Sequence, residues 1–172
     1  MKKSILNTIL AAALVAVPAL AGTNNKPLTE RVRHELVMLP FFSVFDNLSY
    51  RVDGDTVTLF GAVTRPSLKS DAANVVKRLE GVSNVVNTIE VLPLSPFDNR
   101  IRYATARAVY GYGPLQRYRL GTQPSIRIIV KNGNVTLQGV VANEMDRNLA
   151  FMRANGVSGV FGVKNELLVE KH

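Results

Sequence analysis

The stretch Val57-Thr-Leu-Phe-Gly-Ala-Val63 decides the fold, because it returns 78 residues later as Val135-Thr-Leu-Gln-Gly-Val-Val141. A second pattern keeps the same spacing: Gly81-Val82, Asn87 and Val91 return as Gly159-Val160, Asn165 and Val169. A repeat of this length in constant register indicates that a folding unit has been duplicated. The sequence therefore predicts two domains, residues 22–93 (copy one) and 94–172 (copy two), each near the lower size limit for a self-sufficient core.

Residues 1–21 precede both copies and have the layout of a cleaved secretory signal. Lys2 and Lys3 are followed by an apolar run and by the small-residue site Ala19-Leu20-Ala21. The chain contains no cysteine, so neither a lipoprotein anchor nor a disulfide can form. We expect a periplasmic or secreted protein that begins at Gly22, the alternative being an uncleaved N-terminus that is amphipathic or anchors the chain to a membrane.

The formal net charge of +8 is concentrated in copy two. Copy one carries eight basic and eight acidic residues, whereas copy two carries eleven basic and five acidic residues. A one-sided positive field favours a negatively charged partner, and for an exported protein that partner is more often an envelope lipid than a nucleic acid. The alternative is that the charge serves solubility alone.

The spacing of apolar residues predicts the order helix, strand, strand, helix, strand in each copy. The turn signals Asp53-Gly54-Asp55 and Asn132-Gly133 join the first two strands as antiparallel hairpins. A helical crossover then makes the last strand parallel to the second. The predicted fold class is α+β, with a small mixed three-stranded sheet covered by two helices in each copy.

This order, the Val-Thr-Leu-x-Gly-x-Val strands and the Gly-Val…Val-x-Asn-x-x-x-Val endings resemble the BON domain family. The doublet behind a signal peptide is similar to the periplasmic two-BON proteins that are osmotically inducible. The resemblance implies a non-catalytic module that contacts anionic phospholipid, supports the integrity of the envelope under stress and, in some members, assists other envelope proteins. Copy two departs from the pattern by nine additional residues near 110–121.

The residues that catalysis requires are missing from the sequence. There is no cysteine, the only histidines are His34 and His172, and neither a phosphate-binding loop nor a G-x-S-x-G motif occurs. We therefore expect no enzymatic activity, no metal and no cofactor. We interpret four glycines and two asparagines as structural, the glycines allowing close packing or positive φ and the asparagines tying a loop or a helix end to the sheet: Gly61, Gly81, Gly139, Gly159, Asn87 and Asn165.

The candidate site lies on the first helix of copy two. Arg100, Tyr103, Arg107 and Tyr110 form one stripe at helical spacing, with Ile101, Ala104 and Ala108 expected on a separate apolar face. The insertion adds Tyr112, Arg117, Tyr118 and Arg119. Guanidinium groups pair with phosphate and tyrosines favour the membrane interface, so this pattern predicts contact with anionic lipid headgroups.

The same stripe is also compatible with packing against a neighbouring domain or a protein partner, and with simple solvation. The function that we expect is peripheral binding to an anionic membrane surface, and the alternative is a chaperone-like module for envelope proteins. Binding to nucleic acid suits the charge but conflicts with the export signal.

Overall fold

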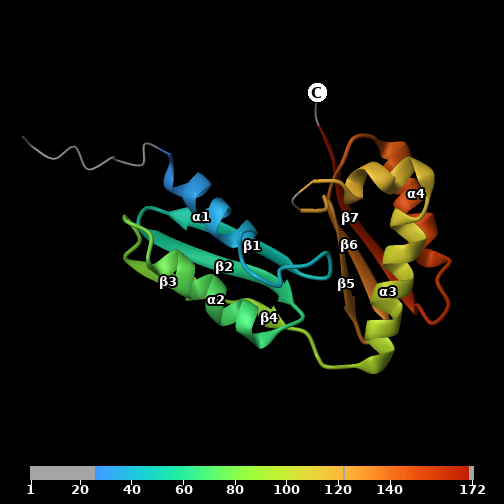
Figure 1. Cartoon of the computed structure of the whole chain (residues 1–172), viewed down its shortest axis with the longest axis horizontal. Coiled ribbons are helices and arrows are strands. Elements are labelled where there is room, and N and C mark those ends of the chain that lie inside the picture. Colours follow the sequence, from blue (N-terminus) through green and yellow to red (C-terminus); the bar gives the residue numbers. More distant parts are fainter. Residues whose placement is uncertain (1–25, 122, 171–172) are drawn as a thin grey trace, which may run out of the picture.

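The computed structural model describes residues 26–121 and 123–170, so the predicted signal sequence lies outside the described residues. Two similar α+β units follow one another along the chain (Figure 1). Copy one consists of α1 (Leu28–Val37), β1 (Asn47–Asp53), β2 (Thr56–Val63), α2 (Pro66–Lys77), β3 (Asn84–Asn87) and β4 (Glu90–Val91). Copy two consists of α3 (Pro96–Tyr110), the 3-10 helix η1 (Gly113–Arg119), β5 (Ile126–Lys131), β6 (Asn134–Val141), α4 (Glu144–Asn155) and β7 (Gly162–Val169).

The predicted sheet topology is confirmed in both copies. β1 and β2 pair antiparallel across the predicted turn, with Val52 opposite Val57, while β3 and β4 both pair parallel to β2. In copy two the sheet order is β5-β6-β7, with the same antiparallel and parallel pairings. The one difference is that the last strand is continuous in copy two but divided into β3 and β4 in copy one.

Each sheet buries one face beneath its two helices. The repeated leucines Leu59 and Leu137 are both fully buried, and their strand neighbours alternate between the helix side and the open side. In Figure 1, α3 and α4 lie on the same side of the sheet formed by β5, β6 and β7. The exposed face of α3 therefore points away from its own sheet.

Helix α3 turns a different face to the core than the alanine pattern predicts. Its buried residues include Ile101, Arg102, Thr105 and Val109, whereas Ala104 and Ala108 are only half-buried, so the apolar face expected at Ile101, Ala104 and Ala108 is correct for Ile101 alone. The buried Arg102 donates to the carbonyl of Val130 at 2.8 Å. Burial lowers the pKa of its guanidinium, although Asp98 opposes the shift.

Asparagines at equivalent positions tie each second helix to the last strand, as predicted. The Nδ2 of Asn87 donates to the carbonyl of Lys69 at 2.8 Å, and its Oδ1 accepts from the amide of Ile89. In copy two, Asn165 bonds the carbonyl of Arg147 and the amide of Leu167 in the same way. The side chain satisfies one helix carbonyl and one strand amide at once, which is a structural role.

The two copies meet where the loop between α1 and β1 lies along the edge of β5. The carbonyl of Ser43 accepts a hydrogen bond from Arg127 at 3.0 Å, and the Arg127 guanidinium lies 4.6 Å from the ring centre of Phe42. Val44 and Phe45 pack against the core of copy two. Copy one thus supplies part of the surface that surrounds α3.

Candidate functional site

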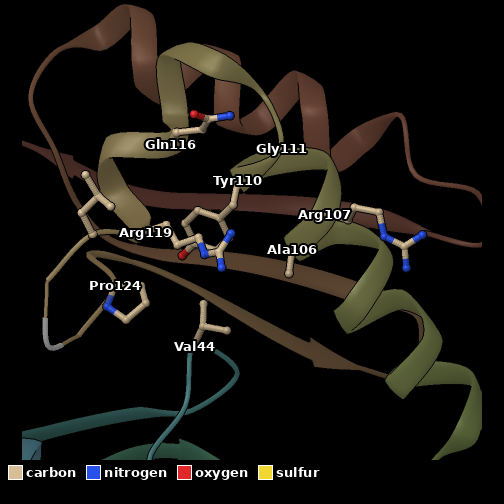
Figure 2. Close-up of a pocket in the computed structure, with 9 residues that line it drawn as sticks. Val44, Ala106, Arg107, Tyr110, Gly111, Gln116, Arg119 and Pro124 are labelled. Carbon is tan, nitrogen blue, oxygen red and sulfur yellow. The ribbon is translucent and has the colours of Figure 1, made fainter.

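A groove opens between the end of α3, η1 and the segment that leads into β5 (Figure 2). Its volume is about 690 Å³, within the range of small-molecule sites. The lining residues are Val44, Ala106, Arg107, Tyr110, Gly111, Gln116, Arg119, Leu120 and Pro124. None of these side chains is acidic, and two of them carry positive charge.

Both apolar and cationic residues line this groove. Val44 from copy one lies on one side of the groove and Ala106 of α3 on another, while the guanidinium of Arg107 extends away from Val44 (Figure 2). Leu120, which directly follows Arg119, is an apolar side chain that is 74% exposed. An anionic group that carries an apolar tail matches this combination, because guanidinium groups pair with the anion while the apolar wall takes the tail.

Three of the predicted stripe residues lie on the exposed side of α3. Arg100 and Arg107 are exposed, and Tyr103 is 62% exposed. The ring of Tyr103 meets that of Phe45 edge to face, with 5.2 Å between the ring centres. This contact orients the tyrosine and leaves most of its ring free.

The prediction that Tyr110 continues this exposed stripe is wrong. Tyr110 is only 8% exposed, and its hydroxyl donates to the carbonyl of Ile126. At 100° per residue, the side chain of Tyr110 points about 80° around the helix axis from that of Arg100. On that side, η1 folds back over the end of α3. Burial raises the pKa of its phenol well above the usual value. Tyr110 therefore forms the floor of the groove.

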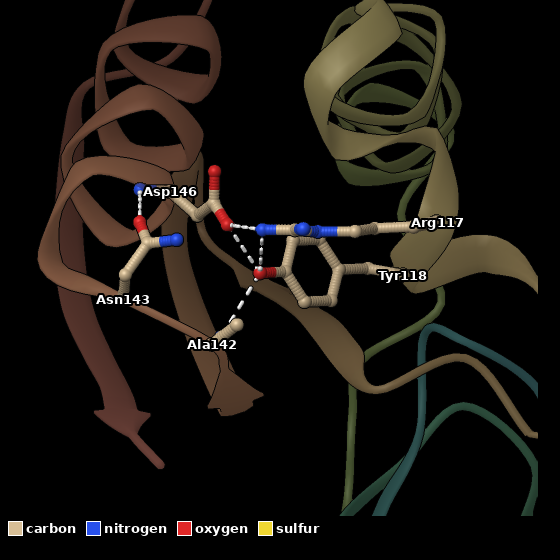
Figure 3. Close-up of polar contacts among 5 residues, drawn as sticks. All are labelled: Arg117, Tyr118, Ala142, Asn143 and Asp146. Carbon is tan, nitrogen blue, oxygen red and sulfur yellow. Dashed lines mark hydrogen bonds and ion pairs between the residues drawn. The ribbon is translucent and has the colours of Figure 1, made fainter.

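Tyr118 and Arg117, predicted as lipid contacts, belong to a polar network within copy two (Figure 3). Tyr118 and Arg117 both donate to the carboxylate of Asp146 on α4, and Tyr118 also accepts from the amide of Ala142 at 2.9 Å. Asp146 is only 4% exposed. Burial, and then the hydrogen bond to Asp146, raise the pKa of Tyr118, while the same carboxylate raises the pKa of Arg117.

Tyr112 and Arg119 differ in how accessible they are to a ligand. Tyr112 is half-buried against the core, and the guanidinium of Arg153 lies 5.1 Å from its ring centre. Arg119 is exposed and lines the groove. Of the eight predicted contacts, the structure leaves Arg100, Tyr103, Arg107 and Arg119 on the accessible surface, where their side chains make no hydrogen bond or ion pair with other described residues.

Most other charges of copy two are engaged within the described part of the chain. Ion pairs join Lys131 to Glu90, Arg147 to Glu144 and Lys164 to Glu166. Burial lowers the pKa of Arg127, which lies between the copies. The arrangement leaves a small set of free cations on one side of α3, which can hold an anion by charge-assisted hydrogen bonds.

Sequence reasoning missed Val44, Leu120 and Pro124 in the groove. No local signal marks Val44, because it comes from the other copy.

The predicted structural glycines have clearer signals in the sequence. Gly61 and Gly139 adopt φ of +119° and +118°, and a Cβ there would lie 2.2 Å from the carbonyl oxygen of Asn47 and 1.9 Å from that of Ser125. Gly81 and Gly159 also have positive φ, +87° and +86°.

Residues 26–121 and 123–170 contain no group of three or more His, Cys, Asp or Glu side chains placed to hold a metal. Across the same residues, no helix has the length and hydropathy needed to cross a bilayer.

Comparison with curated proteins finds no match. Among solved structures, the chain is similar to the C-terminal domain of CdsD, the structural protein of the Type III secretion system of Chlamydia trachomatis. That match has 13% identity and a TM-score of 0.34, and covers 84% of this chain and 98% of the other. A second CdsD structure matches with 13% identity and a TM-score of 0.32, over 84% of this chain and 93% of the other. The BON domain family matches residues 24–93 and 115–171, well over half of the sequence, and the chain therefore belongs to that family.

Proposed function

We propose that this protein is an exported envelope protein that acts by binding, and that copy two contacts anionic phospholipid at a membrane surface. The observation that carries the proposal is the groove in which Arg107 and Arg119 accompany apolar walls, with no acidic side chain among the described residues that line it. Members of the BON domain family are generally non-catalytic, which agrees with a binding role. Support of envelope integrity under stress would follow from this contact.

The chemistry of the groove suits a lipid headgroup. A guanidinium group offers paired N–H donors that match two phosphate oxygens, and it remains charged at all physiological pH values. The exposed Leu120 beside Arg119 can enter the apolar side of the interface, and Tyr103 has the amphipathic ring that favours this boundary. Arg100 extends the cationic row along α3.

The test compares two double variants with equal loss of charge. Arg107→Gln/Arg119→Gln should weaken binding to phosphatidylglycerol vesicles about thirtyfold, since each basic group near an anionic surface contributes about 1 kcal/mol. Lys77→Gln/Arg78→Gln removes two exposed cations at the end of α2 in copy one and should have a much smaller effect. Binding should also fall as salt is raised, and phosphatidylcholine vesicles should bind weakly.

Two results would contradict the proposal. Equal losses in the two variants would indicate a diffuse field without a site. Unchanged binding in the Arg107→Gln/Arg119→Gln variant would show that the groove does not contact the lipid. Far-ultraviolet circular dichroism of each variant checks that the substitutions leave the protein folded.

A second candidate function is the binding of envelope proteins. It is favoured by Val140 and Leu168, which are partners in the β6–β7 register and are 44% and 67% exposed on the open side of the sheet. Leu168→Glu introduces the residue that copy one has at the equivalent position, Glu90. Loss of salt-insensitive protection of an unfolded outer-membrane protein in this variant, with lipid binding intact, would support the second function.

A further inference from the structure

The outer side of α4 exposes two methionines that have no counterpart in copy one. Met145 is 71% exposed and Met152 is 57% exposed. The equivalent residues of α2 are Ser67 and Asn74, both exposed polar side chains. Because the two helices hold the same place in the same fold, the fold itself does not require an apolar side chain at either position. We call Met145 and Met152 the methionine face.

Helical geometry places the two side chains together. Seven residues span about 700°, so Met145 and Met152 project in nearly the same direction, two turns apart. Leu149 lies between them on the adjoining flank and packs into the core of copy two. The methionine face is thus a short apolar row on the convex outer side of a helix that is otherwise anchored to its sheet.

The residues that follow the two methionines in the chain link α4 to other parts of copy two. Met145 directly precedes Asp146, whose carboxylate pairs with the half-exposed Arg117. Met152 directly precedes Arg153, which donates to the carbonyl of Ala108 at 3.1 Å and covers the ring of Tyr112. These contacts join the helix that carries the methionine face to η1 and to α3, which carry the cationic groove.

We infer that the methionine face enters the apolar layer of an anionic membrane while the free cations of α3 and η1, Arg100, Arg107 and Arg119, remain among the headgroups. This inference rests on the proposed lipid contact and adds its geometry: the helix layer of copy two lies against the bilayer. A convex row of flexible side chains fits a fluid bilayer without a preformed groove in a partner. The positive charge of Arg100, Arg107 and Arg119 matches anionic headgroups, and long arginine side chains reach that level readily.

Tryptophan fluorescence tests the inference directly, because the chain contains no tryptophan. Three single variants of the full chain are compared, Met145→Trp, Met152→Trp and, as the control in copy one, Asn74→Trp. With phosphatidylglycerol vesicles, emission from the first two should move to shorter wavelength and be quenched by lipids brominated on their acyl chains. Emission from the Asn74→Trp variant should remain unchanged.

A second measurement exchanges the methionines for the residues of copy one. Met145→Ser/Met152→Asn should weaken vesicle binding about tenfold, because two partly transferred apolar side chains are lost. This ratio should persist at high salt, unlike the effect of the arginine variants. Thermal stability should change little, because both positions are exposed.

The outcomes separate the two proposals. Vesicle binding that depends on Arg107 and Arg119, without quenching and without loss in the exchanged variant, would overturn the inference and leave the proposed function standing. Failure of the parent protein to bind anionic vesicles would overturn both. A parent dimer that becomes monomeric in the exchanged variant would assign the methionine face to a second copy of the chain and overturn its assignment to lipid.

Discussion

The amide of Ile128 donates a 2.9 Å hydrogen bond to the carbonyl of Val44, and this bond joins the two repeated units. An edge strand exposes backbone donors and acceptors that readily pair with other chains. Here the loop between α1 and β1 occupies part of the free edge of β5, and its side chains pack into the core of copy two. The groove beside Arg107 therefore depends on both copies, because Val44 is one of its walls.

Asp46 should be the residue on which this loop depends most. Its carboxylate is fully buried and accepts hydrogen bonds from Ser43 and Thr64, including their amides at 2.9 and 2.6 Å. Asp46→Ala leaves these donors unpaired and should reduce the free energy of unfolding by about 3 kcal/mol. Asp46→Asn keeps one acceptor and should cost less. Urea denaturation measures both, and a loss below about 0.5 kcal/mol for the alanine variant would contradict the role.

Gly139 should tolerate no side chain. A Cβ there would overlap the backbone carbonyl of Ser125 at 1.9 Å, and the φ of +118° is unfavourable for any other residue. Gly139→Ala should therefore cost at least about 3 kcal/mol, combining strain with displacement of β5. Gly54→Ala is the matched control, since it has positive φ but no atom within 4 Å of the added carbon. It should cost about 1 kcal/mol, and an equal effect of the two changes would refute the packing argument.

The duplicated strands could be predicted from the sequence because their signals are local. Apolar and polar residues alternate around Leu59 and Leu137, and this pattern specifies the buried face of each strand without knowledge of the rest of the chain. The asparagines at positions 87 and 165 mark the last strand of each copy in the same local way. The position of Tyr110 could not be predicted in this way. Its burial results from the path of η1, and the same helical wheel is compatible with exposure when that segment is absent.

The candidate site was only partly predictable for the same reason. Arg100, Tyr103 and Arg107 lie where helical spacing predicts them, on the accessible side of α3. Arg117 and Tyr118 carry the residue types of a lipid contact, but Asp146 engages both from 28 or more residues away in the sequence. Val44 reaches the groove only because the copies dock. Such long-range contacts leave no periodic signal in the chain.

Tyr110 should make stability depend on alkaline pH. Its buried phenol remains neutral in the folded protein because burial raises its pKa, whereas in the unfolded chain it ionises near pH 10. The resulting stabilisation is complete below about pH 10 and is lost as pH rises toward the pKa of the folded state. Urea denaturation across this range should show stability falling with pH. Tyr110→Phe should reduce that slope and cost about 1 kcal/mol at neutral pH through the lost hydrogen bond to Ile126. An unchanged slope would contradict the assignment.

Arg117 and Arg119 should differ sharply when each is changed to glutamine, although they are two residues apart in η1. Arg117 pairs with the buried carboxylate of Asp146, so Arg117→Gln should lower the urea midpoint of unfolding measurably. Arg119 is exposed and makes no ion pair with the described residues, so Arg119→Gln should leave the midpoint unchanged and weaken binding to anionic vesicles. The double variant Arg117→Gln/Asp146→Asn supplies the control, because removing both charges should restore part of the lost stability. If Arg117→Gln weakened vesicle binding as strongly as Arg119→Gln while the midpoint stayed constant, Arg117 would belong to the lipid contact and the ion pair with Asp146 would contribute nothing to the fold.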